Sequence, residues 1–227
     1  MSKSRVLVVA AHPDDEVLGC GGSIARHVAL GDEVQVAIMA QGLFSRGTPH
    51  ESERQALQGA CREANRLLGV HGVECFDLPD NRLDSLDLLD VIKPVESLIE
   101  RHRPDIVYTH WSGDVNIDHR RLHEAVVTAC RPQPGHPVRT LLFFEIPSST
   151  EWQVPHSAPA FWPAWFNDIG ACLEIKLRAL EAYAMEMRPW PHSRSLQAVE
   201  HLARWRGASV GMEAAEAFVL GRQLNRF

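Results

Sequence analysis

The chain alternates short, mainly apolar runs, of which the first is continuously apolar, with longer segments in which apolar residues recur every three or four positions. The short runs are rich in β-branched residues, as is typical of buried strands in a parallel sheet, and they occupy residues 6–11, 32–39, 73–78, 106–108 and 140–146. The longer segments are predicted to be helices, at residues 51–68, 86–102, 119–130 and 167–187. This alternation predicts an α/β fold: a Rossmann-like, mostly parallel sheet flanked by helices.

Two residues mark details of the predicted helices. Gly69 follows directly after segment 51–68 and is expected to end that helix. Pro94 lies inside segment 86–102, where its missing N–H is expected to bend or interrupt the helix. No linker, repeat or low-complexity stretch separates these segments, so residues 1–227 are expected to form a single domain.

The first polar cluster follows the first strand, where residues 11–16 read Ala-His-Pro-Asp-Asp-Glu. Pro13 forces a turn, so the acids fall at the start of the next helix, beyond the carboxyl end of the strand. A helix cap accounts for one or two acids but not for His12 as well. His12 and Asp15 suit two ligands of a catalytic zinc site, and the intervening Asp14 suits a separate base.

A third ligand is expected from another strand end. The strand at 106–108 runs into a polar loop and then into a helix that opens near His119. Parallel strands end at the same edge of a sheet, so His119 is expected beside His12, with Asp118 holding a neighbouring ligand by a hydrogen bond. His123, one helical turn later, ranks below His119 because no Glu follows in a His-Glu-x-x-His pattern.

These two segments resemble the signatures of the zinc-dependent PIG-L or LmbE-like de-N-acetylases, which remove acetyl groups from N-acetylglucosamine-type sugars. Residues 11–16 match the first signature fully, and residues 116–119 match the second, His-Pro-Asp-His, at its last two positions. The order of strands and helices is also similar over most of the chain. The resemblance implies that zinc is bound, and the same ligands would accept Fe²⁺ or Co²⁺.

By this resemblance the zinc ligands are His12, Asp15 and His119, and Asp14 is the catalytic base. Metal-bound water has a pKa of about 7, so hydroxide is available near neutrality to attack the acetamide carbonyl while Asp14 takes the proton. The products are acetate and a free amino sugar. The nearest alternative is a related amidase that removes a larger acyl group from its conjugate.

One position departs from the second signature, because Asn116 stands where the commoner form has a His. That His is expected to polarise the amide carbonyl, and an Asn cannot act as a general acid. His192 lies in a segment that resembles a late His-rich loop of the family and is the obvious substitute, while His110 is a nearer alternative. Asn116, Asp118 and His192 are therefore candidate catalytic residues beside Asp14.

A glycine-rich stretch at residues 18–23, Leu-Gly-Cys-Gly-Gly-Ser, indicates a rival class, the nucleotide-binding oxidoreductases. The pattern Gly-x-Gly-x-x-Gly fails because position 24 is Ile, and the preceding acids would repel a pyrophosphate. We interpret the glycines as allowing close helix packing, and Cys20 as a packing residue. A metal-binding protein without catalysis is a second rival, which the presence of Asp14 disfavours.

Two loops on the same edge of the sheet are expected to shape the substrate pocket. Arg46 follows the second strand, and Asn81 and Arg82 follow the third. These side chains suit hydrogen bonds to sugar hydroxyls or to a phosphate, although such residues are equally common in ordinary turns. We therefore treat all three as candidate substrate-binding residues.

A long segment at residues 145–166 carries Trp152, Trp162 and Trp165 among several prolines. Aromatic faces suit sugar rings and equally suit burial against another subunit, so the segment is expected to form a lid or a subunit contact. Family members often form trimers or hexamers, so the resemblance implies a homo-oligomer. In such an assembly His192 can serve an adjacent subunit's site.

The composition and charge of the chain exclude some classes of binding partner. The 227 residues include 45% hydrophobic positions, enough for one substantial core, and the net charge of −6 argues against a nucleic-acid partner. No apolar run is long enough to span a membrane, and no signal peptide is recognised, so a cytoplasmic location is expected. The five cysteines form no Cys-x-x-Cys pair and are expected to be reduced.

Overall fold

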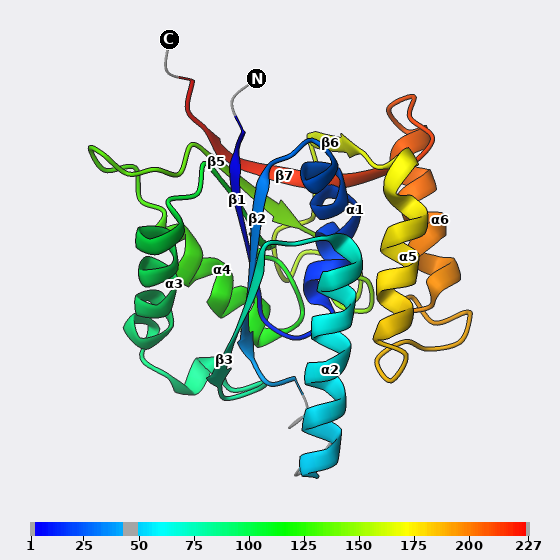
Figure 1. Cartoon of the computed structure of the whole chain (residues 1–227), viewed down its shortest axis with the longest axis horizontal. Coiled ribbons are helices and arrows are strands. Elements are labelled where there is room, and N and C mark those ends of the chain that lie inside the picture. The colour runs from blue at the N-terminus through cyan, green and yellow to red at the C-terminus, as the bar shows by residue number, and fades with distance from the viewer. Residues whose placement is uncertain (1–2, 43–49, 226–227) are drawn as a thin grey trace.

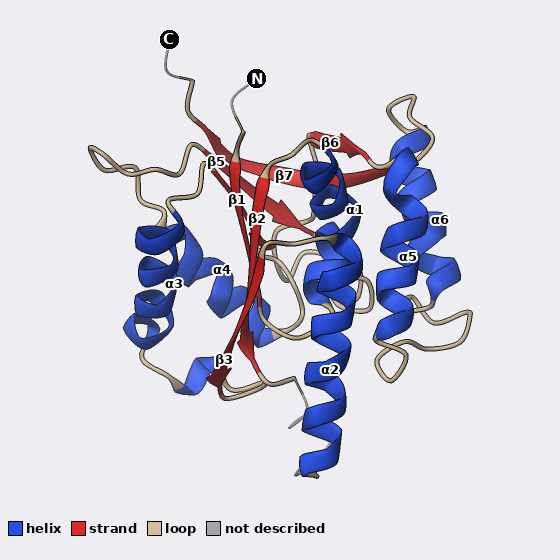
Figure 2. Cartoon of the chain, in the orientation of Figure 1, coloured by secondary structure: helices blue, strands red, loops and turns tan. Residues whose placement is uncertain are grey.

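The computed structural model describes residues 3–42 and 50–225. Within these ranges the protein is a three-layer α/β structure, with a sheet between two layers of helices (Figures 1 and 2). The seven strands of the sheet lie in the order β3-β2-β1-β4-β5-β7-β6. Their bounds are β1 (Arg5–Ala10), β2 (Glu33–Ala40), β3 (Gly72–Leu78), β4 (Ile106–His110), β5 (Thr140–Phe144), β6 (Trp165–Asp168) and β7 (Ala215–Gln223).

The predicted Rossmann-like, mostly parallel sheet is confirmed. Strand β1 is central and pairs in parallel with β2 and β4, while β3 and β5 extend the parallel part on either side. Strand β7 runs antiparallel between β5 and β6. The five predicted strands are all present, and β6 and β7 were not predicted.

Six described helices cover the sheet: α1 (Asp15–Ala29), α2 (Glu51–Leu68), α3 (Leu88–His102), α4 (Ile117–Ala129), α5 (Leu173–Ala182) and α6 (Leu196–Ala208). Helices α3 and α4 lie on one face, and the other four lie on the opposite face (Figure 1). Strand β1 shows why its sequence is continuously apolar. Val6 and Val8 belong to the core under α1 and α2, whereas Leu7 and Val9 belong to the core under α3 and α4.

Three details test the helix predictions. Helix α2 ends at Gly69, which has a left-handed φ of 78°, as expected. Pro94 was expected to bend or interrupt this helix; α3 continues through it, so it does not interrupt the helix. The predicted helix at 167–187 is too long at both ends. Residues 167 and 168 pair with β7 in the sheet, and the helix ends at Ala182 because Tyr183 has non-helical backbone angles (φ −88°, ψ 35°).

Helix α1 is broken near its middle, where Cys20 has non-helical angles (φ −150°, ψ 24°). The glycines around the break allow the close packing that the sequence predicted. A Cβ on Gly19 would lie 2.5 Å from the Phe144 ring, and one on Gly22 would lie 2.7 Å from Ile169. Cys20 itself is buried, in agreement with a packing role.

A buried ion pair between Lys176 and Glu216 forms hydrogen bonds with both halves of α1. Lys176 of α5 donates to the Leu18 carbonyl at 2.9 Å and to Glu216 of β7 at 2.6 Å. The Glu216 carboxylate accepts from the backbone N–H groups of Gly22 and Ser23 at 2.9 and 2.7 Å. Lys176 therefore donates a hydrogen bond to a carbonyl at the end of the first half of α1, and Glu216 accepts hydrogen bonds from the N–H groups at the start of the second half.

None of the helices in the described part of the chain combines the length and the apolar character that a membrane span requires.

Candidate active site

The loops after strands β1 to β5 meet at a cavity of about 290 Å³, which the connection from α5 to α6 also lines. The predicted site residues that line it are His12, Asp14, Asp15, Asn81, Asn116 and His119. Asp118 lies behind His12. Arg82 and His192 are not among the lining residues, and Arg46 falls outside the described part of the chain.

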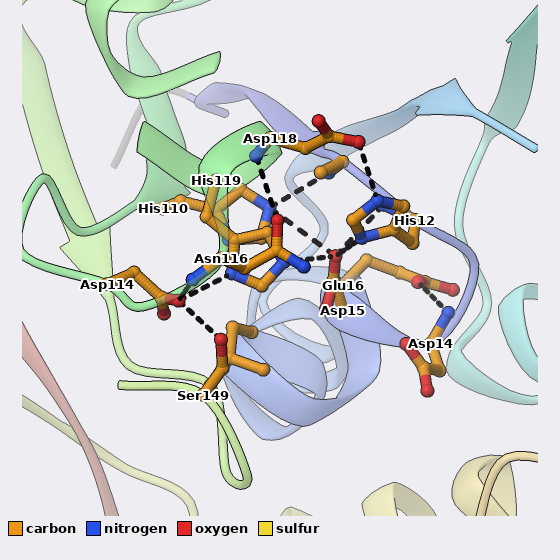
Figure 3. A network of polar contacts seen from close by, with 12 residues as sticks. His12, Asp14, Asp15, Glu16, His110, Asp114, Asn116, Asp118, His119 and Ser149 are labelled. Carbon is orange, nitrogen blue, oxygen red and sulfur yellow. Dashed lines mark hydrogen bonds and ion pairs between the residues drawn. The ribbon is translucent and has the colours of Figure 1, made fainter. Parts of the chain in front are cut away.

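Three predicted metal ligands converge at the floor of this cavity (Figure 3). The Asp15 Oδ2 atom lies 3.1 Å from His12 Nδ1 and 3.2 Å from His119 Nε2. In a tetrahedral zinc site with bonds of 2.0–2.1 Å, ligand atoms stand about 3.4 Å apart. His119 Nε2 is buried and makes no hydrogen bond of good geometry among the described residues, and its nearest polar neighbour is the Asp15 carboxylate. The donor set and spacing therefore fit a divalent metal ion.

In each of His12 and His119, the ring nitrogen that does not face Asp15 lies within hydrogen-bonding distance of a carboxylate. His12 Nε2 lies 3.1 Å from Asp118 Oδ2 and 3.2 Å from Asp80 Oδ1, and His119 Nδ1 lies 3.2 Å from Asp114 Oδ1. Such pairs are the usual support of metal-binding histidines, because they fix the tautomer and the ring orientation. Asp118 therefore lies where a positioning carboxylate is expected, and Asp80 and Asp114 are two further positioning candidates that the sequence reasoning missed.

A second group, His12, Asp80 and Asp118, is also close enough to hold a metal ion. The Asp118 carboxylate is already engaged, since Oδ2 accepts from Asn81 N at 2.6 Å and Oδ1 accepts from Leu83 N at 3.0 Å. These bonds tie the loop after β3 to the start of α4. The group of His12, Asp15 and His119 is therefore the stronger candidate for holding a metal ion.

The electrostatics of the site favour a positive charge between the carboxylates. Burial disfavours the charged imidazolium, but Asp15 and Asp114 outweigh it and raise the pKa of His119 to about 9. Burial would likewise raise the pKa of Asp114, but His119 and several hydrogen bonds lower it to about 2. A divalent cation supplies the charge that this arrangement stabilises.

Asp14 faces the cavity from a strained turn. It is 2% exposed, and its φ of 103° lies in the left-handed region that side chains rarely adopt. Glu16 holds this turn, because its Oε2 accepts from Asp14 N at 3.0 Å while its Oε1 accepts from Asn65 Nδ2 at 2.8 Å and Tyr183 OH at 2.7 Å. Burial raises the pKa of Asp14 well above its usual range, although the nearby Arg194 opposes that shift.

Arg194 is the functional candidate that the sequence reasoning missed. Its Nη1 lies 3.1 Å from Asp14 Oδ2, and its Nε donates to Ser148 Oγ at 2.9 Å. His192, the predicted residue of this loop, accepts a hydrogen bond from Arg194 N through Nδ1 at 3.0 Å and packs edge-on against Trp152. The loop was therefore placed correctly, but the side chain that reaches Asp14 is Arg194.

Asn116 is the N-cap of α4. Its Oδ1 accepts from Asp118 N at 2.8 Å, and its Nδ2 lies 3.4 Å from Asn81 Oδ1. The amide oxygen is thus used by the helix, and only the NH₂ group remains for the cavity.

The other two histidines near the site have structural contacts. His110 is buried at the end of β4, accepts from Ala11 N at 2.8 Å and stacks on His119 with 3.9 Å between ring centroids. Burial lowers the pKa of His110 well below its usual range, so its ring is neutral. His123 lies 2.9 Å from the His110 carbonyl oxygen, in agreement with its low rank as a ligand.

The segment at 145–166 is anchored to the loop after β4. Ser149 and Thr150 both donate to the Asp114 carboxylate, the latter at 2.7 Å, and Trp111 Nε1 donates to the Pro159 carbonyl at 3.2 Å. The segment also brings Trp152 to the cavity.

Comparison with known proteins assigns the family. Residues 7–130 match the model of the PIG-L family, described as GlcNAc-PI de-N-acetylase. The chain belongs to the PIG-L family. It is 33% identical over 192 residues to an uncharacterized deacetylase of Escherichia coli, covering 80% of this chain and 91% of that one. It is 26% identical over 205 residues to the diacetylchitobiose deacetylase of Thermococcus kodakarensis, covering 79% of this chain and 68% of that one.

The PIG-L fold also occurs with other chemistry. The structure of GalB, the 4-carboxy-2-hydroxymuconate hydratase of Pseudomonas putida, superposes with a TM-score of 0.79 at 22% identity, over 99% of this chain and 98% of that one. Function in this PIG-L chain must therefore be argued from the residues of its site.

Proposed function

We propose that this protein is a metal-dependent N-deacetylase that hydrolyses the acetamido group of an N-acetylglucosamine-type sugar or its conjugate. The observation that carries the proposal is the convergence of His12, Asp15 and His119 at the floor of a cavity, with Asp14 beside them. The deacetylases among the relatives of this PIG-L chain support the same reaction.

His12, Asp15 and His119 are the proposed ligands of Zn²⁺, and their nitrogen and oxygen donors would also accept Fe²⁺ or Co²⁺. When bound, the metal supplies Lewis-acid polarisation and a nucleophilic water near neutral pH. Asp118 and Asp80 orient His12, and Asp114 orients His119.

Asp14 is the proposed general base. Its burial favours the protonated form, so it takes the proton of the attacking water readily and then returns it to the leaving nitrogen. Glu16 keeps Asp14 at the cavity by holding the strained turn.

Two donors are proposed to stabilise the oxyanion of the tetrahedral intermediate. Arg194 lies against Asp14 and carries a permanent positive charge, and the Asn116 NH₂ group faces the same cavity. His192 is assigned a positioning role for Arg194 in place of direct contact with the substrate. Asn81 lines the cavity and is a candidate for a sugar hydroxyl, whereas Arg46 and Arg82 stay predictions.

The decisive experiment measures acetate release from N-acetylglucosamine derivatives by the metal-loaded protein, the chelated protein and the Asp14→Asn variant, with metal content determined for each. Asp77→Asn is the matched control, because Asp77 is exposed on β3. We expect release that requires metal and is lost in Asp14→Asn while its metal is retained.

Two other outcomes would redirect the proposal. Release of a longer acyl group in place of acetate would favour the related amidase. Stoichiometric metal without hydrolysis of any acyl derivative would contradict the deacetylase assignment, and a protein that binds no metal after reconstitution would contradict the metal site.

A further inference from the structure

We infer that Cys75 and Cys61 form a peroxide-sensitive thiol pair, in which Cys75 is oxidised first and Cys61 then closes an intramolecular disulfide. The pair joins helix α2 to the edge strand β3. Neither cysteine takes part in the reaction proposed above, so this modification site is separate from the metal site.

The two side chains face each other between α2 and the sheet. Side chains alternate between the two faces of a strand, and residues that pair in register share a face. Cys75 pairs with Ile38 of β2 and lies two residues after Val73, and both of these residues pack in the core under α1 and α2. Cys61 is a buried residue of α2 in the same core (Figure 1). Cys75 therefore points toward the helix that carries Cys61.

The two sulfur atoms are in direct contact. The Cys61 thiol donates a hydrogen bond to the Cys75 sulfur. The Cys61 sulfur also accepts from Asn65 Nδ2 at 3.7 Å, one helical turn along α2, which holds it in place before any oxidation. A disulfide requires that two sulfur atoms approach to about 2.0 Å, and this contact provides the starting geometry.

The two thiols differ in their access to solvent. All five cysteines lie in the described part of the chain, and Cys75 is the exposed one among them, whereas Cys61 is only 1% exposed. A small oxidant in solution therefore reaches Cys75 first. Cys61 is protected from solvent but remains accessible to its neighbour, as expected of a resolving cysteine beside a reactive one.

The surroundings also divide the two roles. The hydrogen bond from Cys61 lowers the pKa of Cys75 to about 7, and Arg62 acts in the same direction, while partial burial and the Glu16 carboxylate oppose the shift. The same hydrogen bond and burial raise the pKa of Cys61, so Cys61 stays a thiol. Since the thiolate is the form that peroxides oxidise, Cys75 is the reactive member of the pair.

Two balanced steps form the disulfide. The Cys75 thiolate attacks one oxygen of hydrogen peroxide, the O–O bond breaks, and a sulfenic acid and a hydroxide ion result. The Cys61 sulfur then attacks the Cys75 sulfur, so the S–S bond forms, the S–O bond breaks, and the hydroxyl leaves as water with the Cys61 proton. The two cysteines lose two electrons and the peroxide gains them. A dithiol reductant reverses the reaction by exchange.

The test treats the native protein with a small excess of hydrogen peroxide, alkylates the remaining thiols under denaturing conditions and identifies the products by mass spectrometry. We expect the loss of two hydrogen atoms from the intact chain, a cross-linked pair of peptides that contains Cys61 and Cys75, and full reversal by dithiothreitol. The three remaining cysteines, which are all buried, should be recovered as free thiols: Cys20, Cys130 and Cys172.

Three variants define the order of the steps, and circular dichroism establishes that each is folded. Cys75→Ser should leave Cys61 unoxidised, because the accessible thiol is gone. Cys61→Ser keeps a hydroxyl donor beside Cys75 and should stop at the sulfenic acid, which dimedone traps. Cys172→Ser is the matched control, because Cys172 is a buried cysteine in the segment before α5, and it should give the same disulfide yield as the native protein.

The inference is overturned if native Cys75 stops at a sulfenic or sulfinic acid while Cys61 remains free, or if Cys75 forms only disulfides between two chains. Oxidation of a buried cysteine in preference to Cys75 would also overturn it. Each of these outcomes is read from the masses of the products of the native protein. The result is therefore independent of whether the protein releases acetate, and failure of the deacetylase proposal would leave it unchanged.

Discussion

The buried pair of Lys176 and Glu216 offers a sharp test of how α1 is held. Their charged groups lie 2.6 Å apart, with side-chain exposures of 4% and 5%. Lys176→Met removes the cation and leaves the Glu216 carboxylate buried with backbone N–H donors alone. Removing one partner of such a pair costs about 3–5 kcal/mol. In a protein of this size each kcal/mol lowers Tm by about 2–4 °C, so we expect a fall of roughly 6–20 °C.

Thermal and urea denaturation followed by circular dichroism provide the measurement. The matched control is Arg204→Met, because Arg204 pairs with Glu200 at side-chain exposures of 48% and 36%, and water screens such exposed pairs so that they contribute little to stability. The double variant Lys176→Met/Glu216→Gln should recover part of the loss, since it carries no unpaired buried charge. The reasoning is refuted if Lys176→Met costs no more than the control, or if the double variant is no more stable than Lys176→Met.

Three further predictions concern packing, reactivity and metal affinity. Gly19→Ala should lower the free energy of unfolding by about 1–3 kcal/mol, because its Cβ would lie 2.5 Å from the Phe144 ring. The control Gly59→Ala should be neutral or stabilising, because a Cβ at that position meets nothing within 4 Å. Equal denaturation midpoints for the two variants would contradict this prediction. A hydrogen bond from the buried Cys61 thiol lowers the pKa of Cys75 to about 7, so the alkylation rate of this exposed cysteine should rise with pH through about 7 and level off above it. Cys75→Ser should remove the fast phase of alkylation. A rate that still rises steeply above pH 8 would refute the lowered pKa. Asp114→Ala should weaken metal binding about 10- to 100-fold in a competition titration, because it removes the carboxylate beside His119, and unchanged affinity would exclude that role.

Local sequence predicted the parts of the site that depend on strand ends. His12 and His119 each follow a buried apolar strand, and a parallel sheet brings such positions to one edge whatever the separation along the chain. The grouping of these two side chains could therefore be predicted from the sequence, whereas their role as metal ligands stays a prediction. Glu51–Leu68 was likewise predictable, because its apolar periodicity and its terminal Gly69 agree.

The missed features depend on contacts between distant segments. Residues 165–168 form strand β6 because they pair with β7, and the sequence of those four residues does not indicate that pairing. In the connection from α5 to α6, His192 was selected because its segment resembles a His-rich loop of the family. No periodicity shows which side chain of this connection points inward, and the residue that reaches Asp14 is Arg194. Glu216 is the second residue of β7 and is buried. A charged residue is seldom buried without a partner, and its partner Lys176 lies in a distant segment of the sequence.

The long reach of Glu216 also affects the order in which the protein can fold during synthesis. This residue is separated from Gly22 by 194 positions. At roughly 5–20 residues per second a ribosome takes on the order of 10–40 s to cover that interval. Both segments that carry the proposed metal ligands are therefore translated long before the carboxylate that caps the second half of α1. Until β7 is made, the backbone N–H groups of Gly22 and Ser23 lack the carboxylate that accepts their hydrogen bonds in the folded protein.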